Sequence, residues 1–448
     1  MKNIKVKNTY DVALSGIPTL DVISIDPKNK VAVLPSTFPN IKPKLVKKMG
    51  EKIKLGEKLF IDKKNPDINF CSPASGEIVD IVYGPRRRLD AILIKEDVSL
   101  DPIVFETHSE ESLNLASRED LVKRLVESGI WPFFRAFPFK TIPKISEVPP
   151  AIYVCLDNDE PFMPQSEILI DHYLSDLKLG LAAVKKIANN NLKLSCKKGN
   201  NKALDALSSM ITHQLIGKYP ANNPAVYLYH AKKNSSENKS WTIKPFDIVR
   251  IGAFLRKGTY PSEILVSMGG SKSDKKCHIK TKEGVSIQDL IGSDLDSKSR
   301  YIAGGVLTGR NASDLPYLGF NDSALTIIEE GSAPEMLSFL SLGTEKPSKT
   351  ATFFSSLTPE ATFDISSSLS GGKRSCIGCS ICVDVCPVNI YPQLLAKSIL
   401  ADDHESSIRH GLLDCADCGL CTYVCPSKIE LGQVIEDKKE QLAKEVLV

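Results

Sequence analysis

Eight of the twelve cysteines of this 448-residue chain lie in two similarly spaced runs near its C-terminal end. Each run reads C-x2-C-x2-C-x3-C-P, the spacing with which a chain holds two [4Fe–4S] clusters. In that arrangement each run gives three thiolates to one cluster and its last cysteine to the other. The spacing predicts cluster I on Cys376, Cys379, Cys382 and Cys425, and cluster II on Cys415, Cys418, Cys421 and Cys386.

The chemistry of this motif follows from its geometry. Three thiolates two residues apart wrap around one cubane, and the proline after the fourth cysteine turns the chain away. Zinc is the alternative, because C-x2-C pairs also form zinc ribbons. Two four-cysteine runs that each end in Cys-Pro favour iron–sulfur, and two neighbouring cubanes imply one-electron transfer rather than metal-assisted hydrolysis.

The remaining cysteines and the histidines show no comparable pattern. We expect the isolated Cys71, Cys155, Cys196 and Cys277 to be buried small residues. The seven histidines are scattered, with no HExxH motif or triad spacing. His404 and His410 fall near the cluster domain, where we expect ordinary surface roles; tuning of a cluster potential is the alternative.

Composition excludes several classes of protein. Lys and Arg total 57 against 54 Asp and Glu, so a net charge of +3 does not indicate a dedicated nucleic-acid binder. No apolar run approaches the roughly 20 residues of a transmembrane helix. The opening MKNIKVKNTYDV has no apolar core of a signal peptide, which excludes a secreted disulfide framework. We expect a soluble, cytoplasmic chain.

The pattern of elements predicts a multidomain α/β protein. The expected units are N-terminal strands with a barrel-sandwich (biotinyl/lipoyl-like) β module at 1–100, a Rossmann-like α/β domain at 101–240, a β-grasp (SLBB-like) ligand-binding-type insert at 241–300, a β segment and linker at 301–370, and a helical ferredoxin domain with two [4Fe–4S] clusters at 371–448.

Residues 30–98 are short apolar runs separated by turns, an order that resembles lipoyl-type carrier modules. Such carriers acylate a lysine at a hairpin tip, and Lys63 and Lys64 fall near that place. We expect plain solvated lysines, because Asn65-Pro66 follows where a carrier hairpin returns into a strand.

The middle of the chain alternates strands and helices. Residues 118–130 and 166–190 have helical spacing, and between them WPFFRAFPFKTIP (131–143) is expected to pack a domain junction, with a ligand cleft as the alternative. After a strand at 192–197, we expect a helix at 203–217, and AVYLYHAK (225–232) closes the series as a strand. No GxGxxG or GxxxxGK[ST] occurs, so the nucleotide-binding fingerprint is missing.

From residue 242 to 345 the pattern is read as mostly β. The expected strands are FDIVRIGAFL, SEILVSMGG, KKCHIKTKEG, YIAGGVLTGR, LTIIEEG and MLSFLSL, with VSIQDLIGS as a short helix. Residues 344–375 are rich in Ser, Thr, Gly and Pro and read as a partly ordered connection. YPQLLAKSILADDHESSIRHGLLD, between the cysteine runs, reads as helices.

These motifs together resemble a known family. Residues 59–94, with DKKNP and SPASG, residues 125–143 and the block 241–272 resemble the A subunits of the sodium-translocating NADH:quinone oxidoreductases (Nqr). The resemblance covers about residues 10–360. GLLDCADCGLCTYVCPSKIELGQVI (411–435) instead resembles the cluster domain of the C subunit of Rnf complexes, whereas Nqr A subunits generally keep only a remnant matching 421–428.

The resemblance implies a peripheral electron-transfer subunit on the cytoplasmic side of the membrane, with other subunits of an Nqr/Rnf-like complex as partners. A quinone is a candidate ligand, and NADH, flavins and the sodium path are expected on the partner subunits. WPFFRAFPF stands where Rnf C subunits carry a Gly-rich flavin loop, so FMN and NADH binding are not expected here.

Two alternatives remain open. The first is an Rnf C-like subunit that itself oxidises NADH at an FMN. The second is a non-enzymatic adaptor that docks a ferredoxin-like partner.

Overall fold

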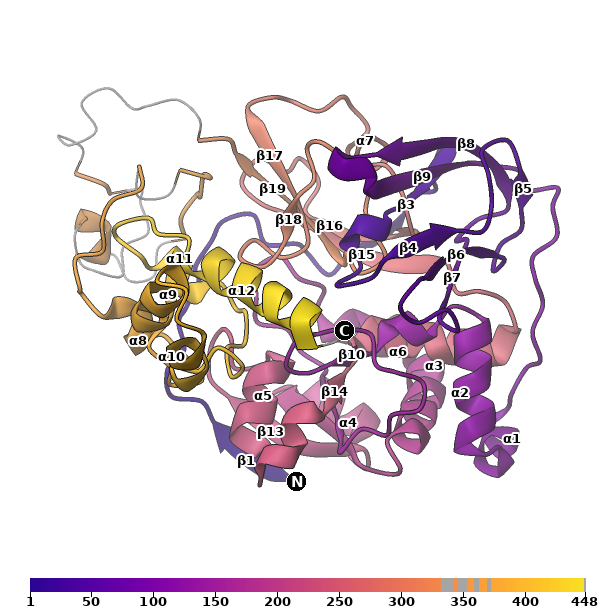
Figure 1. Cartoon of the computed structure of the whole chain (residues 1–448), viewed down its shortest axis with the longest axis horizontal. Helices are drawn as coiled ribbons and strands as arrows, with labels where there is room; N and C mark the ends of the chain where they lie inside the picture. Colours follow the sequence, from indigo (N-terminus) through magenta and orange to yellow (C-terminus); the bar gives the residue numbers. More distant parts are fainter. Residues whose placement is uncertain (332–341, 345–352, 358–361, 369–371, 447–448) are drawn as a thin grey trace.

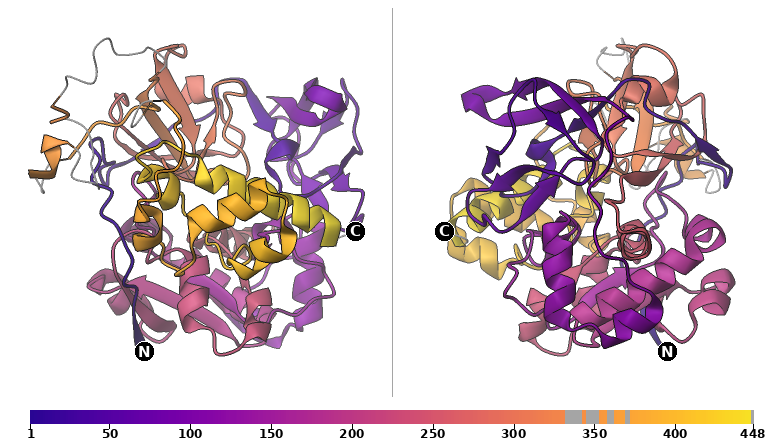
Figure 2. Two further views of the ribbon diagram at one scale, coloured as in Figure 1. Left: turned by 60° about the vertical axis from the view of Figure 1, so that its left-hand side comes forward. Right: turned by 90° about the vertical axis from the view of Figure 1, so that its right-hand side faces the viewer.

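The structure is a computed structural model that describes every residue except 332–341, 345–352, 358–361, 369–371 and 447–448. An α/β layer forms the base of the molecule in Figure 1, and two β units stand above it. The C-terminal helices cover one side. Figure 2 shows these helices at the level where the β units meet the α/β layer.

The N-terminal β module consists of two facing sheets. The first contains β3 (Lys30–Val33), β9 (Leu89–Glu96), β8 (Gly76–Tyr83) and β5 (Lys52–Ile53) in that order; the second contains β4 (Pro43–Leu45), β6 (Lys58–Asp62) and β7 (Asn69–Cys71). Ile53, Phe60 and Ile94 are among the side chains buried between them. Lys63 is exposed and Lys64 half-buried just after β6; the carrier alternative stays a hypothesis.

The α/β layer is built on a six-stranded sheet. Its strands are, in order, β1 (Lys2–Lys5), β13 (Ile211–Ile216), β12 (Leu192–Lys197), β11 (Ile152–Cys155), β14 (Trp241–Thr242) and β10 (Arg135–Ala136). All neighbours pair in parallel except β14 and β10. Every residue of β11 is buried, as expected for a strand covered on both faces.

Helices accompany this sheet, and two of them approach each other closely. They are α1 (Glu110–Leu115), α2 (Arg118–Glu127), α3 (Ser166–Ile187), α4 (Asn201–Leu207), α5 (Pro224–Ala231) and, after β14, α6 (Pro245–Lys257). A Cβ on Gly180 of α3 would overlap the Ile248 carbonyl oxygen of α6, and one on Gly252 of α6 would overlap that of Asp176. Both positions therefore need glycine.

Three predicted elements are wrong. The helix expected at 203–217 ends early, and ITHQLI forms β13 in the parallel sheet. AVYLYHAK is helix α5, which begins at Pro224, and FDIVRIGAFL is helix α6. Proline at the first helical position and the left-handed Gly258 after the last turn are the boundary signals of α6. A short, mostly apolar run does not by itself separate strand from helix.

The second β unit is a sheet in the order β18 (Arg310–Asn311), β17 (Ser299–Ala303), β19 (Ala324–Glu329), β15 (Glu263–Gly269), β16 (Cys277–Lys282) and β2 (Val22–Ser24), with α7 (Ile287–Ile291) packed on it. The strands expected at SEILVSMGG, KKCHIKTKEG and LTIIEEG and the helix in VSIQDLIGS are confirmed. MLSFLSL and much of the predicted connection at 344–375 fall outside the described residues.

The C-terminal unit is helical, as predicted. It contains α8 (Ile381–Asp384), α9 (Pro392–Leu400), α10 (His404–Arg409), α11 (Leu420–Tyr423) and α12 (Leu431–Val446). Short 3-10 helices occur elsewhere, at Pro35–Thr37, Pro85–Arg87, Trp131–Phe133, Ser235–Lys239 and Phe354–Leu357. Within the described ranges, no helix combines the length and apolar character needed to cross a bilayer.

Candidate functional site

The two cysteine runs have the same backbone plan. In each, a four-residue helix, α8 or α11, starts two residues after the second cysteine and contains the third. Three left-handed residues also recur at equivalent places, namely Gly378 and Asp417, Ser380 and Gly419, and Asn389 and Lys428. The runs are therefore structural repeats, as their matching spacing predicts.

The last cysteine of the first run lies among the thiols of the second run. Burial raises the pKa of the Cys418 thiol to about 12, and negative charge on Cys386 contributes to the rise. Burial also raises the pKa of Cys421, together with the neighbouring Cys418, Cys415 and Cys386 and, as the last contributor, Cys382 of the first run. The four residues predicted for cluster II thus lie close together.

The first run has the reciprocal arrangement. Burial raises the pKa of Cys382 to about 11, with Cys379 and Cys425 as its neighbouring thiols. The Ile429 N–H donates to the Cys425 sulfur at 3.5 Å. Cys376 and Cys379 are exposed. Cys425 of the second run therefore lies with the first.

The donor set fits two cubane clusters. The N–H groups of Val388, Asn389 and Ile390 point at the Cys386 sulfur and act against the rise in its pKa caused by burial, so they favour the thiolate that binds iron. Among the described residues no three Cys, His, Asp or Glu converge to hold a single metal ion. A cubane does not need such convergence, because each thiolate binds a different iron. When bound, such clusters accept and release single electrons.

Contacts from the rest of the chain gather on the cluster II residues. The Tyr219 hydroxyl donates to the Cys418 carbonyl oxygen at 2.6 Å, and the Asn8 side chain donates to that of Cys386 at 3.2 Å. The His230 ring lies 2.8 Å from the Pro387 carbonyl oxygen. The residues predicted for cluster II therefore face the body of the protein, whereas Cys376 and Cys379, predicted for cluster I, are exposed.

Asp417, between two predicted ligands of cluster II, forms two ion pairs. Its carboxylate lies 2.8 Å from the Lys439 ammonium of α12 and 3.1 Å from that of Lys140. Burial acts to raise the pKa of Asp417, but the two lysines outweigh it and lower the pKa to about 2. Lys140, Tyr219 and His230 carry no sequence signal for this role, because they are distant in sequence from the cysteines.

A cavity of about 730 Å³ borders this region. Its walls come from both β units, the α/β layer and the C-terminal unit, which contributes Asp417, Lys439 and Lys444. The WPFFRAFPFKTIP segment packs in the core and also borders the cavity, and its role in a ligand cleft stays a prediction. Trp131 and Phe134 are buried in the core, whereas the following residues Arg135, Phe137, Phe139 and Lys140 line the cavity.

The isolated cysteines are buried, and the two C-terminal histidines lie beside polar side chains of the same unit. Cys71, Cys155, Cys196 and Cys277 are buried, as predicted. The His410 ring lies 2.9 Å from the Ser398 hydroxyl, and His404 Nε2 lies 3.4 Å from the Asp402 carboxylate.

Comparison with known proteins identifies the same units. Family models match for the NqrA N-terminal barrel-sandwich hybrid domain at residues 4–97, the NqrA second alpha/beta domain at 116–260 and the NQRA C-terminal domain at 265–314. A 4Fe-4S dicluster domain matches residues 375–429.

Curated relatives agree over most of the chain. The A subunit of the Na(+)-translocating NADH-quinone reductase from Hahella chejuensis (strain KCTC 2396) is 30% identical over 404 residues, 90% of each chain. The corresponding protein of Marinomonas sp. (strain MWYL1) is 29% identical over 403 residues, again 90% of each.

Among solved structures, an NAD+-reducing [NiFe]-hydrogenase in the air-oxidized state is similar over 51% of this chain and 52% of the hydrogenase chain. The identity is 12% and the TM-score 0.31, a likeness too weak to carry an argument. The barrel-sandwich and α/β units, the dicluster domain and the curated relatives together show that the chain belongs to the family of A subunits of the Na(+)-translocating NADH-quinone reductase.

Proposed function

We propose that this chain is a peripheral electron-transfer subunit of a Na+-translocating NADH:quinone oxidoreductase-like complex. It relays single electrons through cluster I on Cys376, Cys379, Cys382 and Cys425 and cluster II on Cys415, Cys418, Cys421 and Cys386. The exchange of last cysteines between the two runs carries this proposal, because Cys386 neighbours Cys418 and Cys421, and Cys425 neighbours Cys382.

The placement of the two sets favours one orientation of the relay. The cluster I set includes two exposed cysteines, so that cluster exchanges electrons with a partner protein. The cluster II set contacts the α/β layer, and Asp417, which lies between two of its cysteines, lines the cavity. Cluster II therefore exchanges electrons inside the protein.

The remaining parts of the proposal concern the complex. NADH oxidation, flavins and sodium movement belong to partner subunits, and this chain lies on the cytoplasmic side of the membrane. A quinone remains a candidate ligand, and FMN is not expected.

The parallel order β13-β12-β11 supports a Rossmann-like assignment for the α/β layer, and the β15–β16 sheet with α7 supports a β-grasp-like unit. The unit boundaries expected from the sequence remain part of this proposal; β14 and α6, which lie beyond residue 240, join the α/β layer.

Metal and flavin analysis tests the proposal. The full chain is purified anaerobically, its iron, acid-labile sulfide and flavin are measured, and EPR spectra are recorded after reduction. We expect about eight iron and eight sulfide per chain, as two cubanes require, and no flavin. Stoichiometric FMN favours the Rnf C-like alternative. Clusters that a ferredoxin-like partner reduces but a quinone does not reoxidise favour the adaptor. Zinc in place of iron contradicts all three.

A pair of variants tests the exchanged ligation. Cys376→Ser with Cys379→Ser removes cluster I and leaves one cluster. Adding Cys386→Ser then removes the second cluster if ligation is exchanged, whereas adding Cys425→Ser leaves it. Ligation within each run gives the opposite result. Cys196→Ser, at a buried cysteine remote from both runs, is the matched control and keeps the remaining cluster.

A further inference from the structure

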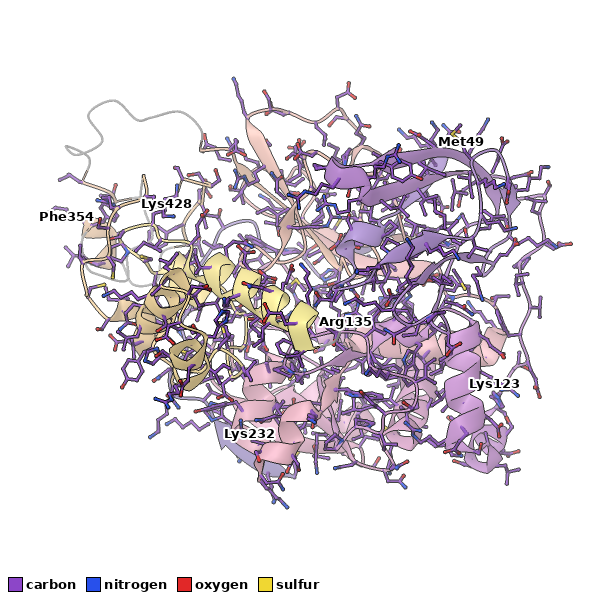
Figure 3. All side chains as sticks on the ribbon, viewed as in Figure 1. Met49, Lys123, Arg135, Lys232, Phe354 and Lys428 are labelled. Atoms are coloured by element: carbon purple, nitrogen blue, oxygen red, sulfur yellow. The ribbon has the colours of Figure 1, made fainter. Side chains whose placement is uncertain are left out.

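The cavity beside Asp417 has two cations on its wall that lack carboxylate partners. Lys244 is exposed and directly precedes α6, and Arg135 lies within the aromatic segment 131–143; both line the cavity. Neither side chain forms an ion pair with a described carboxylate. Lys244 donates to the Asn321 carbonyl oxygen, and one Arg135 nitrogen donates to the Phe134 carbonyl oxygen at 2.9 Å. Figure 3 labels Arg135 near the end of α12.

The carboxylates closest to Lys244 are engaged elsewhere. Asp322 lies 2.7 Å from the Arg310 guanidinium, and Asp247 lies 3.5 Å from that of Arg250. Glu160 accepts from the N–H groups of Leu307 and Thr308, each at 2.9 Å. The positive charge of Lys244 is therefore not cancelled by a direct partner.

Charges of both signs act on Lys244. Burial lowers the pKa of Lys244 and the charge of Arg135 lowers it further, whereas the carboxylates Asp247, Asp322 and Glu160 act to raise it. Burial also lowers the pKa of Arg135, to about 10. For both residues the net result is a lowered pKa, so the nearby carboxylates do not fully offset the factors that disfavour their charged forms, and an anion at this wall would stabilise both cations.

Hydrogen-bonding capacity is also unused at this wall. The Arg135 Nη2, the Asn222 Oδ1 and the Asn40 Oδ1 are buried without a hydrogen-bond partner, and all three residues line the cavity. Buried polar atoms are normally paired, so a cavity with three such residues indicates a polar ligand. Aromatic residues line the same space and favour a ligand that also has an apolar part. They are Phe38, Phe133, Phe137, Phe139, Phe246 and Phe320.

We propose that this cavity binds a small molecule with an aromatic body and an anionic group, and that Lys244 and Arg135 contact the anionic group. The volume of about 730 Å³ suits such a ligand. The anionic group is a phosphate or a carboxylate, which the same two cations bind through charge-assisted hydrogen bonds. This binding site is separate from the proposed relay, and its preference for an anion distinguishes its ligand from a neutral quinone.

Matched probes test the site by calorimetry on the full, cluster-loaded chain. FMN and riboflavin differ by a phosphate, and 1,4-dihydroxy-2-naphthoate and 1,4-dihydroxynaphthalene differ by a carboxylate. We expect one anionic probe to bind at least about tenfold more tightly than its neutral partner, the size of effect that one charge-assisted hydrogen bond gives. The preferred probe shows whether the group is phosphate or carboxylate.

Variants then locate the effect. Lys244→Gln removes the preference for the anionic probe, and Arg135→Gln, measured separately, reduces it. Lys257→Gln, at an exposed lysine at the other end of α6, keeps it. Equal binding of anionic and neutral probes, no binding of either anionic probe, or a preference that survives Lys244→Gln overturns the inference. Iron is measured in every sample, so loss of the clusters is seen separately.

Discussion

The Tyr219 hydroxyl donates a 2.6 Å hydrogen bond to the carbonyl oxygen of Cys418, across 199 residues of sequence. Tyr219 is only 4% exposed, and it packs with Leu420, Tyr423 and Val424 of the second cysteine run. The α/β layer therefore holds the C-terminal unit by the residues that would carry cluster II. In the proposed relay, the contacts that position the C-terminal unit are therefore also those next to cluster II.

Tyr219→Phe should destabilise this junction by about 1 kcal/mol, because it removes one hydrogen bond and leaves a carbonyl oxygen unpaired. Cluster absorbance followed during urea unfolding measures the effect. Tyr391→Phe, at a tyrosine that is 53% exposed, is the control and should leave the midpoint unchanged. Equal shifts in both variants would contradict a specific role for Tyr219.

Lys140→Met should lower the reduction potential of cluster II by an amount on the order of tens of millivolts. Lys140 pairs with Asp417, and loss of its positive charge disfavours addition of an electron nearby. An EPR-monitored redox titration measures both clusters, and that of cluster I should change less. Lys123→Met, at an exposed lysine of α2 labelled in Figure 3, should change neither. A larger shift at cluster I would reverse the assignment of the two sites.

His278 makes the stability depend on pH. Its ring is fully buried, with Nδ1 2.8 Å from the Thr19 carbonyl oxygen and Nε2 accepting from the Gln165 N–H at 3.3 Å. These partners suit the neutral ring, and burial lowers the pKa of His278. As pH falls below about 6.5, the unfolded chain binds a proton that the folded chain does not, so the free energy of unfolding decreases by up to about 1.4 kcal/mol per pH unit.

Denaturation at pH 7.5 and 5.5 checks this sign. We expect His278→Asn to be less stable than the parent at pH 7.5 and to lose less stability between the two values. His172→Asn, at an exposed histidine, should keep the dependence of the parent. A His278 variant with the same loss as the parent would show that other groups control this range.

Gly252→Ala should destabilise the α/β layer by about 1–3 kcal/mol or more through overpacking. Helix propensity alone favours alanine by about 1 kcal/mol, but the new Cβ would overlap the Asp176 carbonyl oxygen. Gly372→Ala, where nothing lies within 4 Å of a Cβ, should be nearly neutral. Thermal unfolding compares the two, and a stabilised Gly252 variant would mean that α3 and α6 separate without cost.

Elements with strong local patterns were predictable from the sequence. The helix α2 has an N-terminal Ser117 cap and apolar residues at helical spacing, and β15 and β16 have β-rich runs between turns. Prediction failed at 211–216, 225–232 and 246–255, where the apolar residues of a short segment fit either a strand or a helix. There β13 is selected by parallel pairing with β12, and α6 by packing on α3.

The sequence alone predicted the cluster chemistry proposed for this protein, because the ligand pattern of a cluster is local. Two cysteine runs with matching spacing supply eight thiols and fold as two matching short-helix repeats. Its family resemblance and its barrel-sandwich unit were likewise readable from short motifs. Only the tertiary structure decided which cluster set faces the body, and that Lys140 and Tyr219 contact the second run. It also joined Arg135 and Lys244 at one cavity. Such contacts link residues more than 100 positions apart. Their energies depend on burial and on neighbouring charges, and neither can be predicted from a local sequence pattern.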